Sequence, residues 1–179
     1  MNTPNKLTLL RVLLVPAFVL LFYWQFPAHY LIATLVFVAA AITDAVDGHL
    51  ARKNNQITDF GKFADPLADK MLVTAAMLWF VECGKMPAWA LLIVICREFA
   101  VSGLRMVAAE QGRVIAAGWS GKVKTAATMV CVILMFLPIP AFLNTLCVWV
   151  IALTTLYSGV EYFVKNLDVF REGAKKEDE

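Results

Sequence analysis

Long apolar runs, separated by short polar segments, make up most of this chain. A helix needs about 20 mostly apolar residues to cross a hydrocarbon core of about 30 Å, and the run near residues 7–24 is long enough to do so. No charged residue occurs between Thr125 and Val160, a stretch too long for one span, and Pro138-Ile139-Pro140 divides it in two. The pattern therefore predicts an all-α fold. We expect six transmembrane helices, near residues 7–24, 29–52, 61–82, 87–109, 121–137 and 141–163.

The composition also indicates a membrane protein. Hydrophobic residues make up 60% and charged residues 17% of the 179 residues, whereas soluble domains contain roughly 45–50% apolar and about 25% charged residues. We expect one membrane domain over residues 1–179, surrounded by a lipid bilayer and without a nucleic-acid partner.

The basic residues orient the predicted spans. Fifteen of the sixteen Lys and Arg residues fall on the same side of the predicted membrane, and only Lys85 falls on the opposite side. Because cytoplasmic loops carry an excess of Lys and Arg, we expect both termini, and the connections after the second and fourth spans, to lie in the cytoplasm. Residues 164–179 then form a charged cytoplasmic tail.

The second to fifth spans reach the required length only by including charged residues at their cytoplasmic ends. Each ionisable group in a span costs roughly 2.5–3.5 kcal/mol, and such groups usually face a polar cavity. We therefore expect a polar active site at the cytoplasmic ends of the helices. Long basic side chains could instead extend to the lipid headgroups, but the short aspartate side chains of these helices cannot.

Four aspartates form the strongest chemical pattern. Asp44 and Asp47 are three residues apart on the second predicted helix, and Asp65 and Asp69 are four apart on the third. Each pair shares one helix face, so two adjacent helices could direct four carboxylates to one place. Four close carboxylates repel one another and need cations or protons. Mg²⁺ or Mn²⁺ would suit these oxygen ligands, and a paired-metal site suits phosphoryl transfer.

Small residues lie beside these acids. Gly48 and Ala51 follow Asp47, and Gly61 precedes Asp65 by one helical turn. They leave room for a planar base or a diphosphate to approach the backbone, and Arg52 could hold a phosphate. The alternative is close packing between helices, which small residues also permit in membranes.

The motif, written along the chain, is Asp44-x2-Asp47-Gly48-x2-Ala51-Arg52-x8-Gly61-x3-Asp65-x3-Asp69. This pattern resembles the complete motif of the CDP-alcohol phosphotransferase family, whose architecture the six predicted spans also resemble. Within the family, four segments resemble the bacterial phosphatidylglycerophosphate synthases: Pro4-Asn5-x-Leu7-Thr8-x2-Arg11, Asp65-Pro66-Leu67-Ala68-Asp69-Lys70, Arg97-Glu98-Phe99-Ala100-Val101 and Gly121-Lys122-x-Lys124-Thr125.

The resemblance implies phosphatidyl transfer from CDP-diacylglycerol to glycerol 3-phosphate, with release of CMP, at a bacterial inner membrane. It implies that two divalent cations are held by Asp44, Asp47 and Asp65 with help from Asp69, and that Asp69 is the catalytic base. It further implies a homodimer. The CDP-lipid site would consist of Gly48, Ala51, Arg52 and Gly61, bordered by Asn5, Thr8 and Arg11.

Four basic residues near the ends of the fourth and fifth spans are candidates for binding the acceptor's phosphate: Arg97, Arg105, Lys122 and Lys124. Arg97 and Arg105 are eight residues apart and so lie on nearly one helix face. Four cations favour a phosphorylated acceptor, while anchoring at the cytoplasmic surface is the alternative. Glu98 is expected to pair with one of them.

Two other interpretations stay open. Inositol phosphate, serine or phosphatidylglycerol could be the acceptor in an enzyme of the same family. An ion-coupled transporter also places acids within the membrane, but it opens to both sides. Here the far halves of the spans are apolar.

Overall fold

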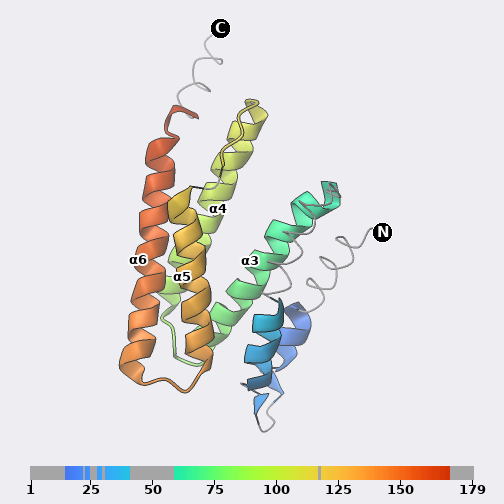
Figure 1. Ribbon diagram of the computed structural model, residues 1–179, viewed down its shortest axis with the longest axis vertical. Helices are drawn as coiled ribbons and strands as arrows, with labels where there is room; N and C mark the ends of the chain where they lie inside the picture. Colours follow the sequence, from blue (N-terminus) through green and yellow to red (C-terminus); the bar gives the residue numbers. More distant parts are fainter. Residues whose placement is uncertain are drawn as a thin grey trace. The chain divides into compact units, whose positions relative to one another are not determined.

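The described parts of the chain are helical. The computed structural model describes residues 15–21, 23–24, 28–29, 31–40, 59–116 and 118–169, with only the backbone for 59–69. Within these ranges no strand occurs, which confirms the all-α prediction. Residues 15–21 form a short helical stretch, followed by the helix Leu31–Ala40. The four longer helices in Figure 1 are α3 (Asp59–Glu82), α4 (Ala88–Glu110), α5 (Trp119–Phe136) and α6 (Ala141–Lys165).

These four helices lie within two residues of the bounds predicted near 61–82, 87–109, 121–137 and 141–163. The predictions near 7–24 and 29–52 are helical at 15–21 and Leu31–Ala40. Residues 23–24 and 29 are also described, with a bend at Trp24, and the other parts of these two predictions lie outside the described residues.

Proline and glycine determine where these helices begin and end. Pro87 and Pro140 occupy the N-cap positions of α4 and α6, with φ of −73° and −59°. Gly84 and Gly112 follow the ends of α3 and α4 with φ of +69° and +74°, a conformation that glycine adopts without strain. In both turns the N–H after the glycine donates to the carbonyl five residues earlier, at 2.8 Å, which is the Schellman pattern that closes a helix.

The chain divides into two compact units. One comprises residues 1–85 and 132–139. Its core is aromatic: the ring centroid of Phe136 lies 4.8 Å from Phe80, 5.6 Å from Phe37 and 6.1 Å from Phe18. Tilted and edge-on pairs at such distances stabilise a core beyond the burial of their surface. The ammonium of Lys85 donates to the carbonyl of Met135 at 2.9 Å and so satisfies a carbonyl in the last turn of α5.

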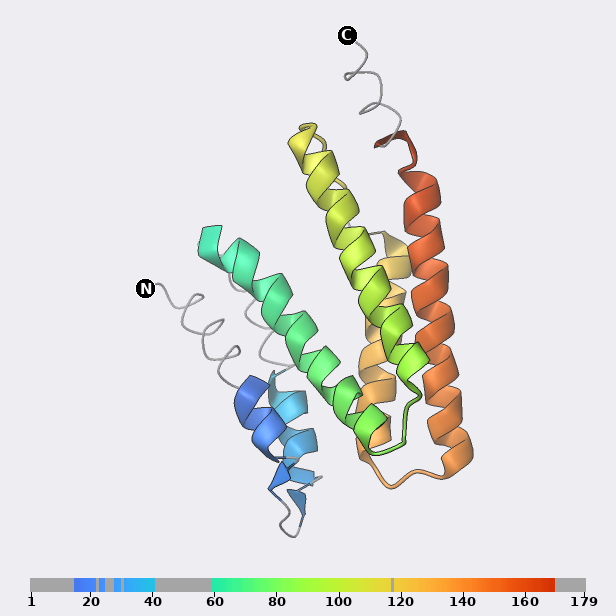
Figure 2. The same ribbon diagram turned by 180° about the vertical axis from the view of Figure 1, so that it is seen from behind.

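The other unit comprises residues 86–131 and 140–179. In it α4 packs against α6, and Figures 1 and 2 show α5 beside both. A buried cluster connects α4 with the C-terminal part of α6 and the residues that follow it: Val101, Leu104, Ala108, Tyr162 and Val169. Near the N-terminal ends of α4 and α6, Trp89 and Trp149 bring their ring centroids to 5.4 Å.

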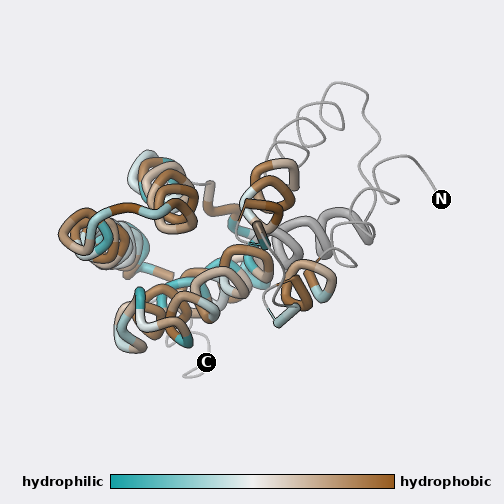
Figure 3. Tube along the Cα trace, turned by 90° about the horizontal axis from the view of Figure 1, so that it is seen from below, coloured by the Kyte–Doolittle hydropathy of each residue, from teal (hydrophilic) through white to brown (hydrophobic). Residues whose placement is uncertain are grey.

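Among the described helices, α5 and α6 are long and apolar enough to cross a membrane. α6 also exposes large apolar side chains along one face, including Leu146, Trp149, Leu153 and Val160, as a lipid-facing helix does. Figure 3 shows apolar residues, in brown, recurring along the described helices. α3 and α4 contain more charged residues and are not apolar enough to count as candidate membrane spans. The six spans therefore stay a prediction.

Candidate functional site

Of the acidic motif, the structure describes the second half, which lies on α3. This helix begins at Asp59, six residues before Asp65, so it starts before the Asp65-Pro66 pair and includes it. Gly61, Asp65 and Asp69 all lie on α3. The two aspartates are four residues apart, so the backbone places them on one face at a rise of about 6 Å.

The remaining acidic and CDP-lipid positions lie outside the described residues: Asn5, Thr8, Arg11, Asp44, Asp47, Gly48, Ala51 and Arg52. Among the side chains that are described, no group of three His, Cys, Asp or Glu could hold a metal ion. The donor set predicted for the site is nevertheless chemically suited to Mg²⁺ or Mn²⁺, because it consists of carboxylate oxygens. The α3 backbone is compatible with this set, since it places Asp65 and Asp69 on one face.

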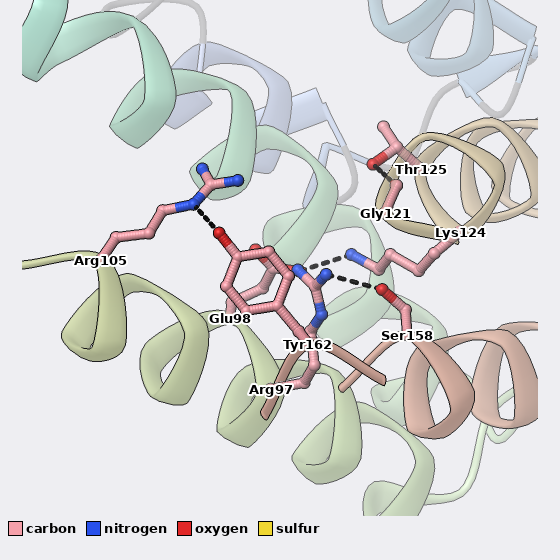
Figure 4. A network of polar contacts seen from close by, with 8 residues as sticks. All are labelled: Arg97, Glu98, Arg105, Gly121, Lys124, Thr125, Ser158 and Tyr162. Atoms are coloured by element: carbon pink, nitrogen blue, oxygen red, sulfur yellow. Dashed lines mark hydrogen bonds and ion pairs between the residues drawn. The ribbon is translucent and has the colours of Figure 1, made fainter. Parts of the chain in front are cut away.

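A network of polar side chains joins α4, α5 and α6 (Figure 4). Arg97 on α4 donates through Nη1 to Oε1 of Glu98 at 3.0 Å. Through Nη2 it donates to Oγ of Ser158 on α6 at 2.8 Å. Lys124 on α5 donates from Nζ to the same Glu98 oxygen at 2.5 Å. The predicted pairing of Glu98 is thus confirmed, and this carboxylate bridges two cations rather than one.

The network is largely removed from solvent. The side chains of Arg97 and Glu98 are 12% and 19% exposed, and that of Lys124 is 9% exposed. Buried ions are tolerated when they are paired and hydrogen-bonded. Among the described side chains, the two cations Arg97 and Lys124 share the single carboxylate of Glu98.

Two glycines make space for Arg97. A Cβ atom at Gly159 on α6 would lie 3.2 Å from Cγ of Arg97, and one at Gly121 on α5 would lie 3.6 Å from its Nη2. Larger residues at position 159 would press on the arginine stem. The Nε atom of Arg97 is buried without a hydrogen-bond partner among the described residues.

Arg105 lies two helical turns beyond Arg97 on α4, at a rise of about 12 Å. Its Nε donates to the phenol oxygen of Tyr162 at 2.6 Å, and its Cζ lies 5.3 Å from the centroid of that ring. Tyr162 is buried, whereas Arg105 is exposed. The guanidinium is therefore held against a buried aromatic residue at the edge of the bundle.

The four predicted acceptor-binding cations do not form a single cluster. Arg97 and Lys124 meet at Glu98, while Arg105 contacts Tyr162. Lys122 is exposed on α5, whereas Lys124 is buried. Residues two positions apart on a helix are rotated by about 200° around its axis, so the two lysines point in nearly opposite directions.

Sequence reasoning missed Ser158 and Tyr162. A signal was present, because both are polar residues on an apolar helix and they are four apart, on one face. On α4, Arg97 donates to Ser158 and Arg105 donates to Tyr162. These polar positions could have marked Ser158 and Tyr162 as candidates for contacts with another helix, but they do not identify the partner residues.

A pocket of about 290 Å³ lies beside this region, between the connection that follows α4 and the end of α6. Its walls include Arg113, Ser120, Tyr162, Lys165 and Asn166. The basic residues are paired: Arg113 forms an ion pair with Asp168, and Lys165 with Glu161. The hydrogen bond from Arg113 holds the pKa of Asp168 below its usual range, so this exposed pair stays ionised at neutral pH.

The sequence comparisons identify the class of protein. Residues 1–157 match the CDP-alcohol phosphatidyltransferase family, and the chain belongs to this family. It is 42% identical to the CDP-diacylglycerol–glycerol-3-phosphate 3-phosphatidyltransferase of Bacillus subtilis, over 95% of this chain and 97% of the relative. A Pseudomonas fluorescens protein of the same name is 45% identical over 79% and 75%. A probable phosphatidylglycerophosphate synthase of Mycobacterium tuberculosis is 40% identical over 93% and 82%.

Proposed function

We propose that this protein transfers the phosphatidyl group of CDP-diacylglycerol to sn-glycerol 3-phosphate, giving phosphatidylglycerophosphate and CMP. The observation that carries the proposal is the similarity to the Bacillus subtilis enzyme of that name, which extends over nearly the full length of both chains. The acidic motif and the basic residues of α4 and α5 support it, because both suit a reaction between two phosphate-bearing substrates.

In this reaction the hydroxyl of the acceptor attacks the phosphorus that carries the diacylglycerol. The bond between that phosphorus and the oxygen of CMP breaks, and CMP leaves. Asp69 accepts the proton of the attacking hydroxyl, as a general base. The CDP-lipid would be bound by Gly48, Ala51, Arg52 and Gly61 together with Asn5, Thr8 and Arg11.

The carboxylates of Asp44, Asp47, Asp65 and Asp69 would hold two divalent cations, Mg²⁺ or Mn²⁺. When bound, these ions neutralise negative charge on the diphosphate and stabilise the leaving CMP. The basic residues Arg97, Arg105, Lys122 and Lys124 would attract the phosphate of the acceptor.

The enzyme would form one membrane domain of six spans in the bacterial cytoplasmic membrane, with both termini in the cytoplasm. The apolar helices α5 and α6 support the insertion, and the distribution of basic residues supports the orientation. A homodimer is proposed on the resemblance to the family.

Purified protein in detergent, given CDP-diacylglycerol and Mg²⁺, tests the proposal by CMP release with different acceptors. We expect turnover with glycerol 3-phosphate and at most background release with inositol 3-phosphate, serine or phosphatidylglycerol. EDTA should abolish the turnover, and added Mg²⁺ or Mn²⁺ should restore it. Preference for another acceptor would overturn the substrate assignment and keep the reaction class. No release with any acceptor would contradict the enzyme and favour the transporter interpretation.

A further inference from the structure

The basic residues of the network differ in how fully their N–H groups are used. Both terminal nitrogens of Arg97 are hydrogen-bonded, one to Glu98 and one to Ser158. Lys124 is buried and donates to Glu98. These two cations connect three helices, and their charge is partly balanced by the carboxylate between them. Their hydrogen bonds therefore indicate a structural role, which is to hold α4, α5 and α6 together.

Arg105 is arranged differently. Only its Nε is hydrogen-bonded among the described residues, and its side chain is exposed. Figure 4 shows its two terminal nitrogens pointing away from the Tyr162 ring. A guanidinium offers five N–H donors in a rigid fork that matches two oxygens of a phosphate. With Nε engaged, the edge formed by Nη1 and Nη2 is the part that can bind an anion.

Tyr162 gives this fork a fixed direction. Its ring is 5% exposed and packs with Val101, Leu104 and Ala108, so the phenol oxygen is a stationary acceptor. The 2.6 Å hydrogen bond and the cation–π contact at 5.3 Å hold Arg105 at two points. An arginine held in place before its ligand binds loses less conformational freedom on binding.

We propose that Tyr162 is a positioning residue that aims Arg105 at the phosphate of the acceptor, and that Arg105 contacts this phosphate directly while Arg97 and Lys124 maintain the helix arrangement. This inference rests on the proposed function and goes further by assigning separate roles to the basic residues.

Replacing Tyr162 with phenylalanine tests the inference, because Y162F removes the phenol oxygen and keeps the buried ring. We expect the KM for glycerol 3-phosphate to rise about tenfold, because Arg105 is then no longer held in place before the phosphate binds. The kcat and the KM for CDP-diacylglycerol should stay within about twofold, and the thermal stability should be unchanged. Y157F, at an exposed tyrosine on the same helix, is the matched control and should behave like the wild type.

Arg105→Lys provides a second test, because it keeps the charge and removes the fork. We expect R105K to raise the same KM at least as much as Y162F. The double variant should be no worse than R105K, because Tyr162 acts through the guanidinium. Additive effects, an unchanged KM in Y162F, or a fall in kcat together with stability would overturn the positioning role. Absence of turnover with glycerol 3-phosphate in the wild type would instead overturn the proposed function and, with it, this inference.

Discussion

Replacing Asp69 with asparagine is expected to lower the rate of CMP release by about 10²–10⁴-fold. Asparagine has the same shape as aspartate, but its amide cannot accept the proton of the attacking hydroxyl. The change also removes one negative charge from the proposed cation site. The protein should still fold and bind CDP-diacylglycerol, because Asp69 lies within a helix of 24 residues that extends well to either side of it. Initial rates of CMP release, measured beside lipid binding, check this result.

Asp59→Asn is a matched control, since Asp59 is on the same helix but outside the motif. This variant should retain wild-type turnover. If D69N keeps activity within about tenfold of the wild type, Asp69 is not the base. If D69N loses both lipid binding and fold, the residue has a structural role and the base must be sought elsewhere.

Glu98→Gln is expected to reduce the free energy of unfolding by about 3 kcal/mol. Glutamine keeps the size of the side chain but not its charge, so Arg97 and Lys124 would stay buried beside each other without the carboxylate that bridges them. Removing one partner of a buried ion pair is costly because the remaining charge has lost both its solvent and its counter-ion. Unfolding by denaturant in detergent micelles measures the loss.

Glu110→Gln serves as the control, because Glu110 is exposed at the C-terminal end of the same helix. Surface changes of this kind usually alter stability by no more than about 0.5 kcal/mol. A similarly small effect of E98Q would mean that the three-helix network does not stabilise the bundle. In that case Arg97 and Lys124 would return as candidates for direct contact with the acceptor.

The helix bounds could be predicted because local chemistry determines them. Pro87 and Pro140 mark the starts of α4 and α6, and Gly84 and Gly112 follow the ends of α3 and α4 with positive φ. These signals act within a few residues, so no knowledge of packing was needed. The Glu98 pairing was also local in part, because Arg97 is its neighbour in the chain.

Contacts between distant segments could not be predicted in the same way. Ser158 lies 61 residues after Arg97, and Tyr162 lies 57 residues after Arg105. Whether a polar residue on α6 faces a basic residue on α4 depends on the rotation and offset of the two helices. By contrast, helical geometry alone predicts opposite directions for Lys122 and Lys124, and treating the four cations as one cluster overlooked this.

The number of spans is harder to establish for a physical reason. The charged groups that build a polar site also reduce the apolar character of the helices that carry them. α4 contains Arg97, Glu98 and Arg105, while α5 and α6 are more uniformly apolar. The four-aspartate site stays a prediction as well, because its side chains lie outside the described residues.

The most direct test of the proposed reaction is to follow labelled glycerol 3-phosphate into lipid with purified protein, CDP-diacylglycerol and Mg²⁺. We expect one CMP to be released for each labelled phosphatidylglycerophosphate formed, and no labelled lipid when CDP-diacylglycerol is omitted. CMP release without labelled lipid would contradict transfer to glycerol 3-phosphate.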